Sequence, residues 1–530
     1  MRWRILSSAL ALMMVMTGLS AVTAEAAAPS CRELVREYGD ARVTEAAEVA
    51  ATGGQPAYCE VRGTAGSKIG FRLRLPLGTY AGRYVQFGCH GLCGVQLPPD
   101  RFPRCGPGGL DGDAAVAVTD DGHTGAGPFP VNIMDGTWAA HDQQARDDYF
   151  YRAPHAVSVA SKRVIAEFYG APPKRSYFDG CSTGGREALL LAQRYPDDFD
   201  GIVAGAPAQD MSALFGVYFT WLARVNDGPD GRPVLTPAKL PALHAAVLKS
   251  CDRLDGLTDG QIDDPRTCTY DPVRLQCPPD TDRPDCLTPA QVAVARRLYD
   301  GPRDPHGRRL YPGWASRGSE LGWEGSSVAG PYGTIAPLAD NYLKYAGYPI
   351  GTPHSSVAQF RFTAAELRRL TAEGAKGNAM SLDLDRFRRR GGKLVLWHGW
   401  ADQSIPAVGT LDYYARLARR NGGLAATRTW ARAFLAPTMY HCGLGGYRLQ
   451  TFDPLPGLMD WVERGTAPDK VVASGTDEHG AARTRPVFAY PLRARYDGTG
   501  SVNDAANFVP AAGRPTRDII RWAGEYLYTR

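Results

Sequence analysis

Short apolar runs alternate with segments of helical periodicity through the first part of the chain. The run at 114–119 is apolar almost throughout, as in a strand that is covered on both faces of a sheet. The pattern predicts strands at 71–76, 84–87, 114–119, 176–178 and 201–204 and helices at 156–169 and 186–194. Because strand and helix alternate, the sequence predicts a parallel α/β sheet.

The alternation fades after about residue 210. Residues 210–390 hold four cysteines, many Pro and Asp residues and several polar helices, and strand-like runs return at 393–397 and 427–435. A core that is interrupted by an insertion explains this change. We expect the core to comprise 27–209 and 391–530, with a lid at 210–390 and further short strands beyond residue 480.

The N-terminus has the pattern of a secretory signal peptide. Arg2 and Arg4 precede a mostly apolar stretch at 5–16, and a small-x-small site follows at 24–26. These features predict a signal peptide over residues 1–26, with a buried N-terminal helix as the alternative. The rest of the chain has no apolar run of about 18 residues, so no membrane-spanning helix is expected.

Composition and charge exclude several classes of protein. Hydrophobic residues make up 44% of the 530 residues and charged residues 22%, which is ordinary for a globular protein and argues against disorder and coiled coil. Lys and Arg number 60 against 55 Asp and Glu, a net charge of +5. A dedicated nucleic-acid binder would need a basic stripe or patch, which this balance does not favour.

The cysteine count suggests disulfides. In an exported protein, eleven cysteines indicate disulfides rather than zinc ligands. Cys89 and Cys93 have metal-like spacing, but no second such pair accompanies them, and we therefore expect no zinc site. Because the count is odd, one thiol should be left over or bonded to another chain. The sequence leaves open the pairing of Cys31, Cys59, Cys89, Cys93 and Cys105.

The candidate chemistry lies in the segment Gly180-Cys-Ser-Thr-Gly184, which matches G-x-S-x-G between a predicted strand and a predicted helix. A sharp strand-to-helix turn lifts the Ser182 hydroxyl clear of the backbone, and the small residues on either side relieve crowding. The free N–H groups at the start of the helix favour a developing oxyanion. Ser182 is therefore the predicted nucleophile. The alternative is an ordinary Gly-rich turn.

A serine nucleophile needs a histidine base, and the base needs an acid to orient it. Where the serine lies in a strand-to-helix turn of this kind, the acid and then the histidine follow it along the chain. Asp402 lies in a loop just beyond the strand at 393–397, where the acid is expected. His441 follows an apolar segment and is the favoured base. His398 and His479 are the weaker alternatives, the first as a loop-packing residue and the second in a charged loop.

Two cysteines flank the predicted pair. Cys181 directly precedes Ser182, and Cys442 directly follows His441. If the serine and the histidine share a hydrogen bond, their neighbours must also be close, so a bridge between these cysteines would hold base and nucleophile together. The alternative is two unrelated cysteines.

At this point the sequence resembles the tannase and feruloyl esterase family, in the family's order from about residue 31 to about residue 465. The matching segments are Thr119-Asp-Asp-Gly-His123, Tyr177-Phe-Asp-Gly-Cys-Ser-Thr-Gly-Gly-Arg186, Phe199-Asp-Gly-Ile-Val-Ala-Gly-Ala-Pro207, His398-Gly-Trp-Ala-Asp402 and His441-Cys442. The resemblance implies an exported serine esterase with an α/β-hydrolase core and a large inserted lid. It also implies a Ser182–Asp402–His441 triad, with a disulfide between Cys181 and Cys442.

The oxyanion hole is expected to use two backbone N–H groups. One belongs to Thr183, the residue after the nucleophile, and the other to a Gly-rich loop after an early strand. Residues 88–94 fit that loop and resemble the family's version, with Gly91 as the favoured donor. Cys89, His90 and Cys93 depart from the family's pattern.

Residues 251–263 of the lid predict a calcium loop. Three carboxylates crowd there beside two glycines, and such a set suits a hard cation, although a solvated Asp-rich turn is the alternative. The resemblance implies side-chain ligands from Asp252, Asp255 and Asp259 and carbonyl ligands from Leu257 and Gln261. We expect Cys251–Cys268 to close this loop, Cys277–Cys286 to close a second one, and Ca²⁺ to be structural.

We therefore expect a secreted serine carboxylesterase that hydrolyses esters of hydroxycinnamic or gallic acids through an acyl-enzyme. Its substrate would be a small aromatic ester or an ester linked to plant polyphenol or polysaccharide. Aromatic lid residues such as Phe215, Tyr218 and Trp323 are candidates for a wall against a flat acyl group. Two alternatives remain, namely a serine hydrolase of polyester, lipid or peptide bonds, and an inactive secreted relative that binds polyphenol or carbohydrate. The oligomeric state stays open.

Overall fold

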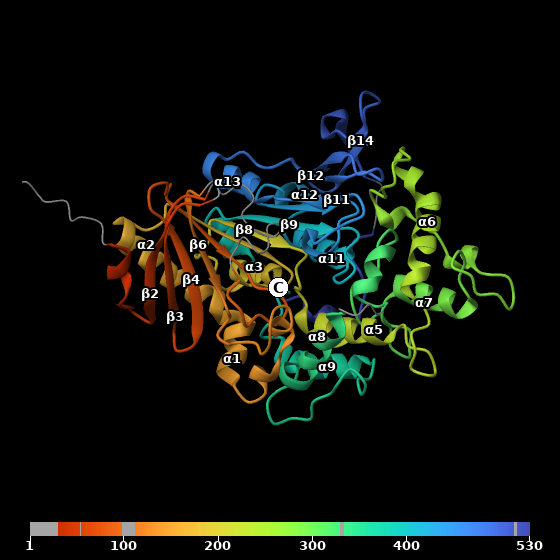
Figure 1. The fold of residues 1–530 in the computed structure, drawn as a ribbon, viewed down its shortest axis with the longest axis horizontal. Coiled ribbons are helices and arrows are strands. Elements are labelled where there is room, and N and C mark those ends of the chain that lie inside the picture. Colours follow the sequence, from red (N-terminus) through yellow and green to blue (C-terminus); the bar gives the residue numbers. More distant parts are fainter. Residues whose placement is uncertain (1–29, 53–54, 98–111, 329–332, 514–516, 530) are drawn as a thin grey trace, which may run out of the picture.

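One ten-stranded sheet organises the protein (Figure 1). The computed structural model describes residues 30–52, 55–97, 112–328, 333–513 and 517–529, so the predicted signal peptide and Cys105 lie outside the described residues. The strands lie in the order β1-β2-β3-β4-β6-β5-β7-β8-β9-β10.

The sheet has a parallel part and an antiparallel part. The parallel strands are β6 (Ala114–Thr119), β5 (Arg83–Phe87), β7 (Arg175–Cys181), β8 (Gly201–Gly205), β9 (Lys393–Gly399) and β10 (Ala431–Ala436). The antiparallel strands are β1 (Glu37–Tyr38), β2 (Ala41–Val49), β3 (Tyr58–Ala65) and β4 (Ile69–Pro76). β4 pairs antiparallel with β6, which joins the two parts. The α/β class is thus confirmed, while the antiparallel extension was not predicted.

Both faces of the parallel part are buried, which explains its apolar strands. Along β9, Leu394 and Leu396 pack on one face, whereas Val395 and Trp397 pack on the other. The first face is covered by α2 (Ala153–Tyr169), α3 (Thr183–Arg194) and α11 (Ala407–Arg420). The second is covered by α13 (Leu455–Arg464) and by a small sheet of β11 (Leu449–Thr451), β12 (Lys470–Thr476) and β13 (Ala482–Phe488).

The chain leaves the sheet after β8 and returns to the neighbouring position at β9, where Gly201 pairs with Lys393. Residues 206–392 thus form an insertion between two adjacent strands. Its apolar side chains form one hydrophobic cluster, which also takes in Leu92, Tyr149 and Phe150 from the first part of the chain. Its helices include α4 (Met211–Ala213), α5 (Phe219–Arg224), α6 (Leu240–Cys251), α7 (Pro289–Asp300), α8 (Ile335–Asn341), α9 (Ala364–Gly374) and α10 (Asp385–Arg389). Figure 1 shows α6 and α7 at the end of the molecule opposite β2 and β3.

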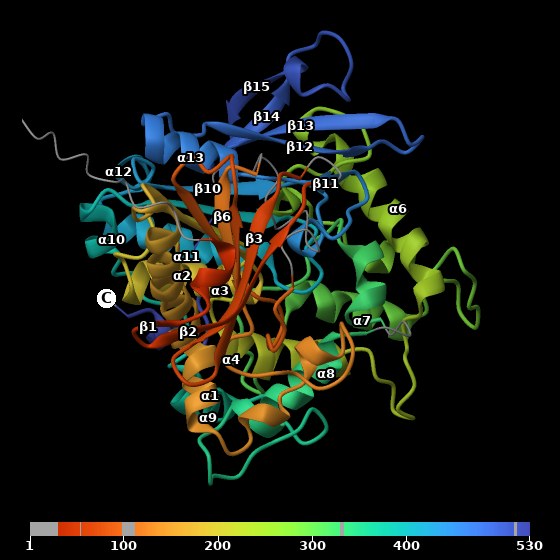
Figure 2. The ribbon, with the colours of Figure 1, turned by 60° about the vertical axis from the view of Figure 1, so that its left-hand side comes forward.

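The last part of the chain adds short strands outside the main sheet. β14 (Leu492–Tyr496) and β15 (Phe508–Ala512) form a two-stranded ribbon, seen with β12 and β13 at the top of Figure 2. The last strand of the main sheet begins at Ala431 rather than at residue 427. Residues Leu424–Thr427 instead form a short helix, α12, after Gly422 and Gly423, both of which have positive φ.

Ten cysteines form five disulfides. The pairs are Cys31–Cys59, Cys89–Cys93, Cys181–Cys442, Cys251–Cys268 and Cys277–Cys286. Such a set is typical of proteins that fold in an oxidising environment. None of the helices in the described residues is both long enough and apolar enough to cross a membrane.

The close approach of α3 to β8 gives a testable prediction. A Cβ at Gly185 would lie 2.3 Å from the carbonyl oxygen of Gly205 and 2.8 Å from Cα of Pro207, both backbone atoms that cannot rotate away. We expect Gly185→Ala to lower the free energy of unfolding by about 1–3 kcal/mol, measured by denaturant unfolding. Gly78→Ala is the control, because nothing lies within 4 Å of that Cβ. Equal midpoints for the two variants would contradict the packing argument.

Candidate active site

Ser182 lies in the turn that joins β7 to α3. Its backbone has φ 64° and ψ −121°, a conformation that costs a non-glycine residue roughly 1–3 kcal/mol. Backbone hydrogen bonds hold it there, from Ser182 N to Gly205 O at 3.0 Å and from Ala208 N to Ser182 O at 3.0 Å. The turn therefore presents the Ser182 side chain at the carboxyl end of the parallel sheet.

Three glycines make the turn possible. A Cβ at Gly180 would lie 2.3 Å from the carbonyl oxygen of Gly184, and one at Gly88 would lie 2.4 Å from Gly184 Cα. The strand, the helix and the Gly-rich loop therefore meet backbone to backbone. This explains why the segment around Ser182 contains small residues at these positions.

Asp402 and His441 meet at the ends of neighbouring strands. Asp402 follows β9 and His441 follows β10, and Asp402 Oδ2 lies 2.7 Å from His441 Nδ1. Asp402 Oδ1 also accepts hydrogen bonds from the backbone N–H groups of Ser404 and Ile405, both at 2.8 Å. The carboxylate is thus fixed on both oxygens, and His441 Nδ1 carries the proton that points to it.

His398, the weaker candidate for the base, is instead a second partner of Asp402. It is fully buried, and its Nε2 lies 3.1 Å from Asp402 Oδ2 and 2.8 Å from Ile405 O. Because both neighbours are acceptors, Nε2 carries the proton, and Nδ1 accepts from the Thr410 hydroxyl at 2.8 Å.

Burial alone would raise the pKa of Asp402, but the charge of His441 and the hydrogen bonds from both imidazoles hold this pKa below its usual value. The other alternative, His479, is exposed in a loop beside Glu478.

The Cys181–Cys442 disulfide joins the neighbours of Ser182 and His441 across 261 positions. His441 Nε2 points toward this bridge and lies 3.6 Å from Cys442 Sγ. Among the described residues, no hydrogen bond joins the Ser182 and His441 side chains. The structure thus brings Ser182 and His441, the predicted nucleophile and base, to the same place through their neighbours.

The Gly-rich loop is fastened to the start of α3. The Thr183 hydroxyl donates to the Gly91 carbonyl oxygen at 2.7 Å, and Gly184 N donates to Cys89 O at 2.9 Å. The Tyr149 hydroxyl donates to the same Gly91 carbonyl at 3.1 Å. The N–H groups of Thr183 and Gly91 have no acceptor in the described part of the chain, so both can serve an incoming oxygen.

His90 was not assigned from the sequence, yet it lies beside the base. Burial, together with the nearby His441, lowers the pKa of His90 to about 4. His90 is therefore neutral at physiological pH and adds no positive charge next to the His441 imidazole.

Part of the insertion covers this site. The lid residue Gly322 lies against Gln403 and the ring of Tyr440, and Gln403 Oε1 accepts a hydrogen bond from His441 N at 3.3 Å. The aromatic lid residues proposed as an acyl wall are core residues, since Phe215, Tyr218 and Trp323 are each at most 2% exposed. Their rings are packed inside the hydrophobic cluster between the lid and the core, where large aromatic side chains bury much apolar area.

The predicted calcium loop is crowded with carboxylates. Asp252 accepts hydrogen bonds from the backbone N–H groups of Asp259, Gly260 and Gln261, and the Cys251–Cys268 disulfide closes the segment. Burial and the neighbours Asp263, Asp259 and Asp252 raise the pKa of Asp255 to about 8. The side-chain oxygen Oε1 of Gln261 is buried without a hydrogen-bond partner.

Two arginines that the sequence did not single out also reach this loop. Arg483 and Arg485 of β13 both bind Asp259 Oδ2, so this carboxylate already has positive partners. Leu257 lies in the loop with its N–H donating to Asp255 Oδ1 at 2.9 Å. Carboxylate and carbonyl oxygens of this kind are the donors that a hard cation prefers. Asp259 is shared between the loop and β13.

The sequence profile of the Tannase and feruloyl esterase family matches residues 51–511. This chain belongs to that family. Mono(2-hydroxyethyl) terephthalate hydrolase of Piscinibacter sakaiensis is 35% identical over 520 residues, covering 86% of this chain and 85% of that protein. A probable feruloyl esterase of Arthroderma benhamiae is 30% identical over 458 residues, covering 78% and 81%. The crystal structure of feruloyl esterase B from Aspergillus oryzae has a TM-score of 0.78 at 26% identity, covering 91% of this chain and all of that one.

Membership makes the protein a carboxylic ester hydrolase and confirms the α/β-hydrolase fold class that the resemblance implied. Ester hydrolysis agrees with the side chains that lie at the ends of the parallel strands. A hydroxyl at a strained turn, an imidazole and a buried carboxylate are the groups that acyl transfer needs.

The disulfide beside the site should matter for both stability and turnover. We expect Cys181→Ala with Cys442→Ala to lower the free energy of unfolding by about 2–5 kcal/mol and to reduce ester hydrolysis, because His441 loses its covalent link to the turn. The matched control is Cys277→Ala with Cys286→Ala, which removes a bridge spanning 9 positions in the lid. Wild-type turnover in the first variant would contradict the positioning role.

Proposed function

We propose that this esterase cleaves esters of aromatic carboxylic acids through an acyl-enzyme on Ser182. The observation that carries the proposal is the meeting of three strand ends, where Asp402 holds His441 beside the turn of Ser182. Ser182 Oγ attacks the ester carbonyl carbon, and His441 Nε2 takes the hydroxyl proton. Asp402 keeps the Nδ1 proton in place and stabilises the imidazolium that forms.

The N–H groups of Thr183 and Gly91 receive the oxyanion of the tetrahedral intermediate. Collapse of this intermediate expels the alcohol, which takes its proton from His441. A water molecule then attacks the acyl-Ser182 ester, with His441 again accepting a proton. Collapse of the second tetrahedral intermediate breaks the bond to Ser182 Oγ, which takes this proton back from His441, and the aromatic acid leaves. Thr183 is the first residue of α3, where the helix dipole also favours negative charge.

The substrate class follows from the relatives. One relative is named for mono(2-hydroxyethyl) terephthalate and another for feruloyl esters, and both names describe an aromatic acid joined to an alcohol. We therefore infer a small aromatic acyl ester, either free or linked to plant polyphenol or polysaccharide.

Export from the cell, with cleavage of residues 1–26, belongs to the same proposal and is supported by the five disulfides.

We also propose that Ca²⁺ binds the lid loop through the carboxylates of Asp252, Asp255 and Asp259 and the carbonyls of Leu257 and Gln261. The crowding of these carboxylates and the unpartnered Gln261 Oε1 support this. The ion would balance their charge and fix the loop, remote from the ester.

Substrate comparison tests the function. Among methyl ferulate, methyl gallate, mono(2-hydroxyethyl) terephthalate, p-nitrophenyl palmitate and a peptide, we expect the aromatic acyl esters to have the highest kcat/KM.

Variants of the triad test the mechanism. Ser182→Ala should abolish this turnover while leaving the melting temperature unchanged, and Asp402→Asn should lower kcat by roughly 10⁴-fold with a small change in KM. Full activity of Ser182→Ala would exclude the acyl-enzyme.

Chelation tests the calcium loop. At a Ca²⁺ concentration 100-fold above Kd, binding adds ~2.7 kcal/mol of stability, so EDTA should lower the melting temperature of the wild type. Asp255→Asn should abolish this EDTA sensitivity. The control is Asp230→Asn, an exposed lid carboxylate that should respond to EDTA like the wild type. A melting temperature independent of both Ca²⁺ and EDTA in the wild type would refute the site.

A further inference from the structure

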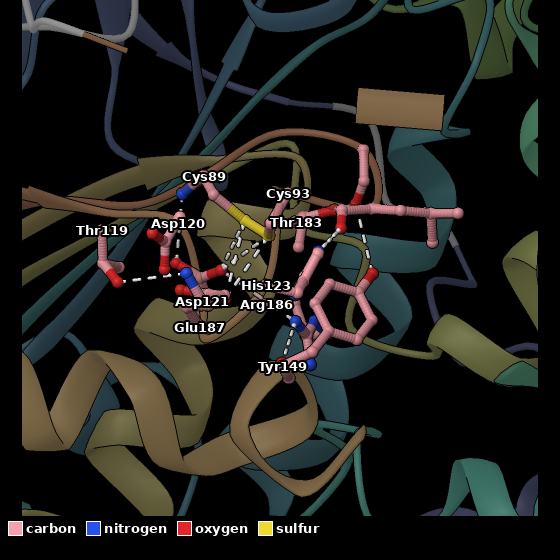
Figure 3. Close-up of a disulfide and its surroundings, with 12 residues drawn as sticks. Cys89, Cys93, Thr119, Asp120, Asp121, His123, Tyr149, Thr183, Arg186 and Glu187 are labelled. Carbon is pink, nitrogen blue, oxygen red and sulfur yellow. Dashed lines mark hydrogen bonds and ion pairs between the residues drawn. A yellow bond between two sulfur atoms is a disulfide. The ribbon is translucent and has the colours of Figure 1, made fainter. Parts of the chain in front are cut away.

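The Gly-rich loop carries a feature that ester hydrolysis does not use. Cys89 and Cys93 form a disulfide across the loop, and two carboxylates from other segments, Asp121 and Glu187, reach the same point. Figure 3 shows both carboxylates turned toward the sulfur atoms. All four side chains are buried, with exposures of 8%, 0%, 0% and 1%.

The distances between these groups are short. Cys89 Sγ lies 2.9 Å from Glu187 Oε1, and Cys93 Sγ lies 3.4 Å from Asp121 Oδ2. The crossed distances are 3.7 Å from Cys89 Sγ to Asp121 Oδ2 and 3.8 Å from Cys93 Sγ to Glu187 Oε1. Two sulfurs and two carboxylate oxygens thus surround one point.

This set stands out among the potential ligands of the molecule. Within the described ranges, it is the one group of three or more His, Cys, Asp or Glu residues whose ligand atoms all lie within 4.8 Å of one another. The sequence argued against zinc because Cys89 and Cys93 have no second cysteine or histidine pair. The fold supplies the second pair as carboxylates, from the loop after β6 and from α3.

The carboxylates are not fully satisfied by the protein. Asp121 Oδ1 is buried without a hydrogen-bond partner, although Asp121 is 0% exposed. Glu187 and Asp121 approach the same two sulfur atoms, so two carboxyl groups crowd one buried point. The buried guanidinium of Arg186, 4.0 Å from Glu187, offsets part of the negative charge. A cation at this point would relieve the repulsion between the two carboxyl groups.

We propose that Cys89, Cys93, Asp121 and Glu187 form a binding site for a divalent transition-metal ion when the Cys89–Cys93 disulfide is reduced. Two thiolates and two carboxylates give a four-coordinate site, and such a donor set suits Zn²⁺. The disulfide form lacks the two thiolates and does not bind the ion there. The site is distinct from the calcium loop, whose donors are all oxygen atoms.

The chemistry balances with a small dithiol as reductant. The dithiol gives two electrons and two protons to the disulfide, which becomes two thiols, and the dithiol becomes its own disulfide. The metal ion then displaces one proton from each thiol. Metal binding at the thiols therefore releases two protons for each ion bound.

Cobalt binding tests this site with a signal that is independent of ester hydrolysis. The full chain is treated with a mild dithiol, the reductant is removed without air, and alkylation with mass spectrometry identifies the free thiols. Co²⁺ is then titrated. We expect one Co²⁺ per chain, with sulfur-to-cobalt charge-transfer absorption and the strong visible bands of a four-coordinate ion, and we expect Zn²⁺ to displace it.

Matched variants locate the bound ion. Cys89→Ser with Cys93→Ser should abolish the cobalt signal, whereas Cys277→Ser with Cys286→Ser, which removes another short-loop cysteine pair, should retain it. Asp121→Asn and Glu187→Gln should each weaken Co²⁺ binding by roughly ten-fold or more. Retention of the same signal without Cys89 and Cys93, or absence of stoichiometric binding in wild-type protein whose Cys89 and Cys93 are shown to be free thiols, would overturn the proposal.

Discussion

The turn at Ser182 is the constraint on which the rest of the site depends. A serine at φ 64° is held in place because strand, helix and Gly-rich loop approach so closely that Gly180, Gly184 and Gly88 have no room for a side chain. The same approach fastens the Gly-rich loop to α3, through Gly184 N and the Thr183 hydroxyl. Ser182 and the proposed oxyanion donors are therefore positioned by one packing arrangement, and a change in any of the three backbones would move both.

The base reaches this turn from a distant part of the chain, and two kinds of interaction secure it. Asp402 fixes the orientation of His441, and Asp402 is itself fixed by His398 and by two backbone N–H groups. The Cys181–Cys442 bridge fixes the position of the loop. Hydrogen bonds thus set the direction of the imidazole, while a covalent bond sets its location.

The sequence predicts the parts of this esterase that depend on local pattern. Ser182, Asp402 and His441 could be selected because each follows an apolar strand, and strand ends meet at one edge of a parallel sheet. It does not predict contacts that depend on how distant segments pack. The antiparallel strands β1–β4, the hydrogen bond from His398 to Asp402 and the binding of Asp259 by Arg483 and Arg485 are all of this kind. The start of the last strand was misplaced because paired glycines after α11 allow a short helix first.

The pairing of acidic groups beneath the Gly-rich loop follows from the same packing. Glu187 lies one turn after Thr183 on α3, so its side chain returns toward the loop that the start of α3 touches. There Glu187 Oε2 accepts the Cys89 N–H at 3.2 Å while Oε1 faces the sulfur of the same residue. One carboxylate thus contacts both the backbone and the side chain of the loop. Gly91 lies between the two cysteines, so any change in the bonding of their sulfurs acts within two residues of the proposed oxyanion donor. The loop's backbone geometry and the state of its sulfurs are therefore physically coupled.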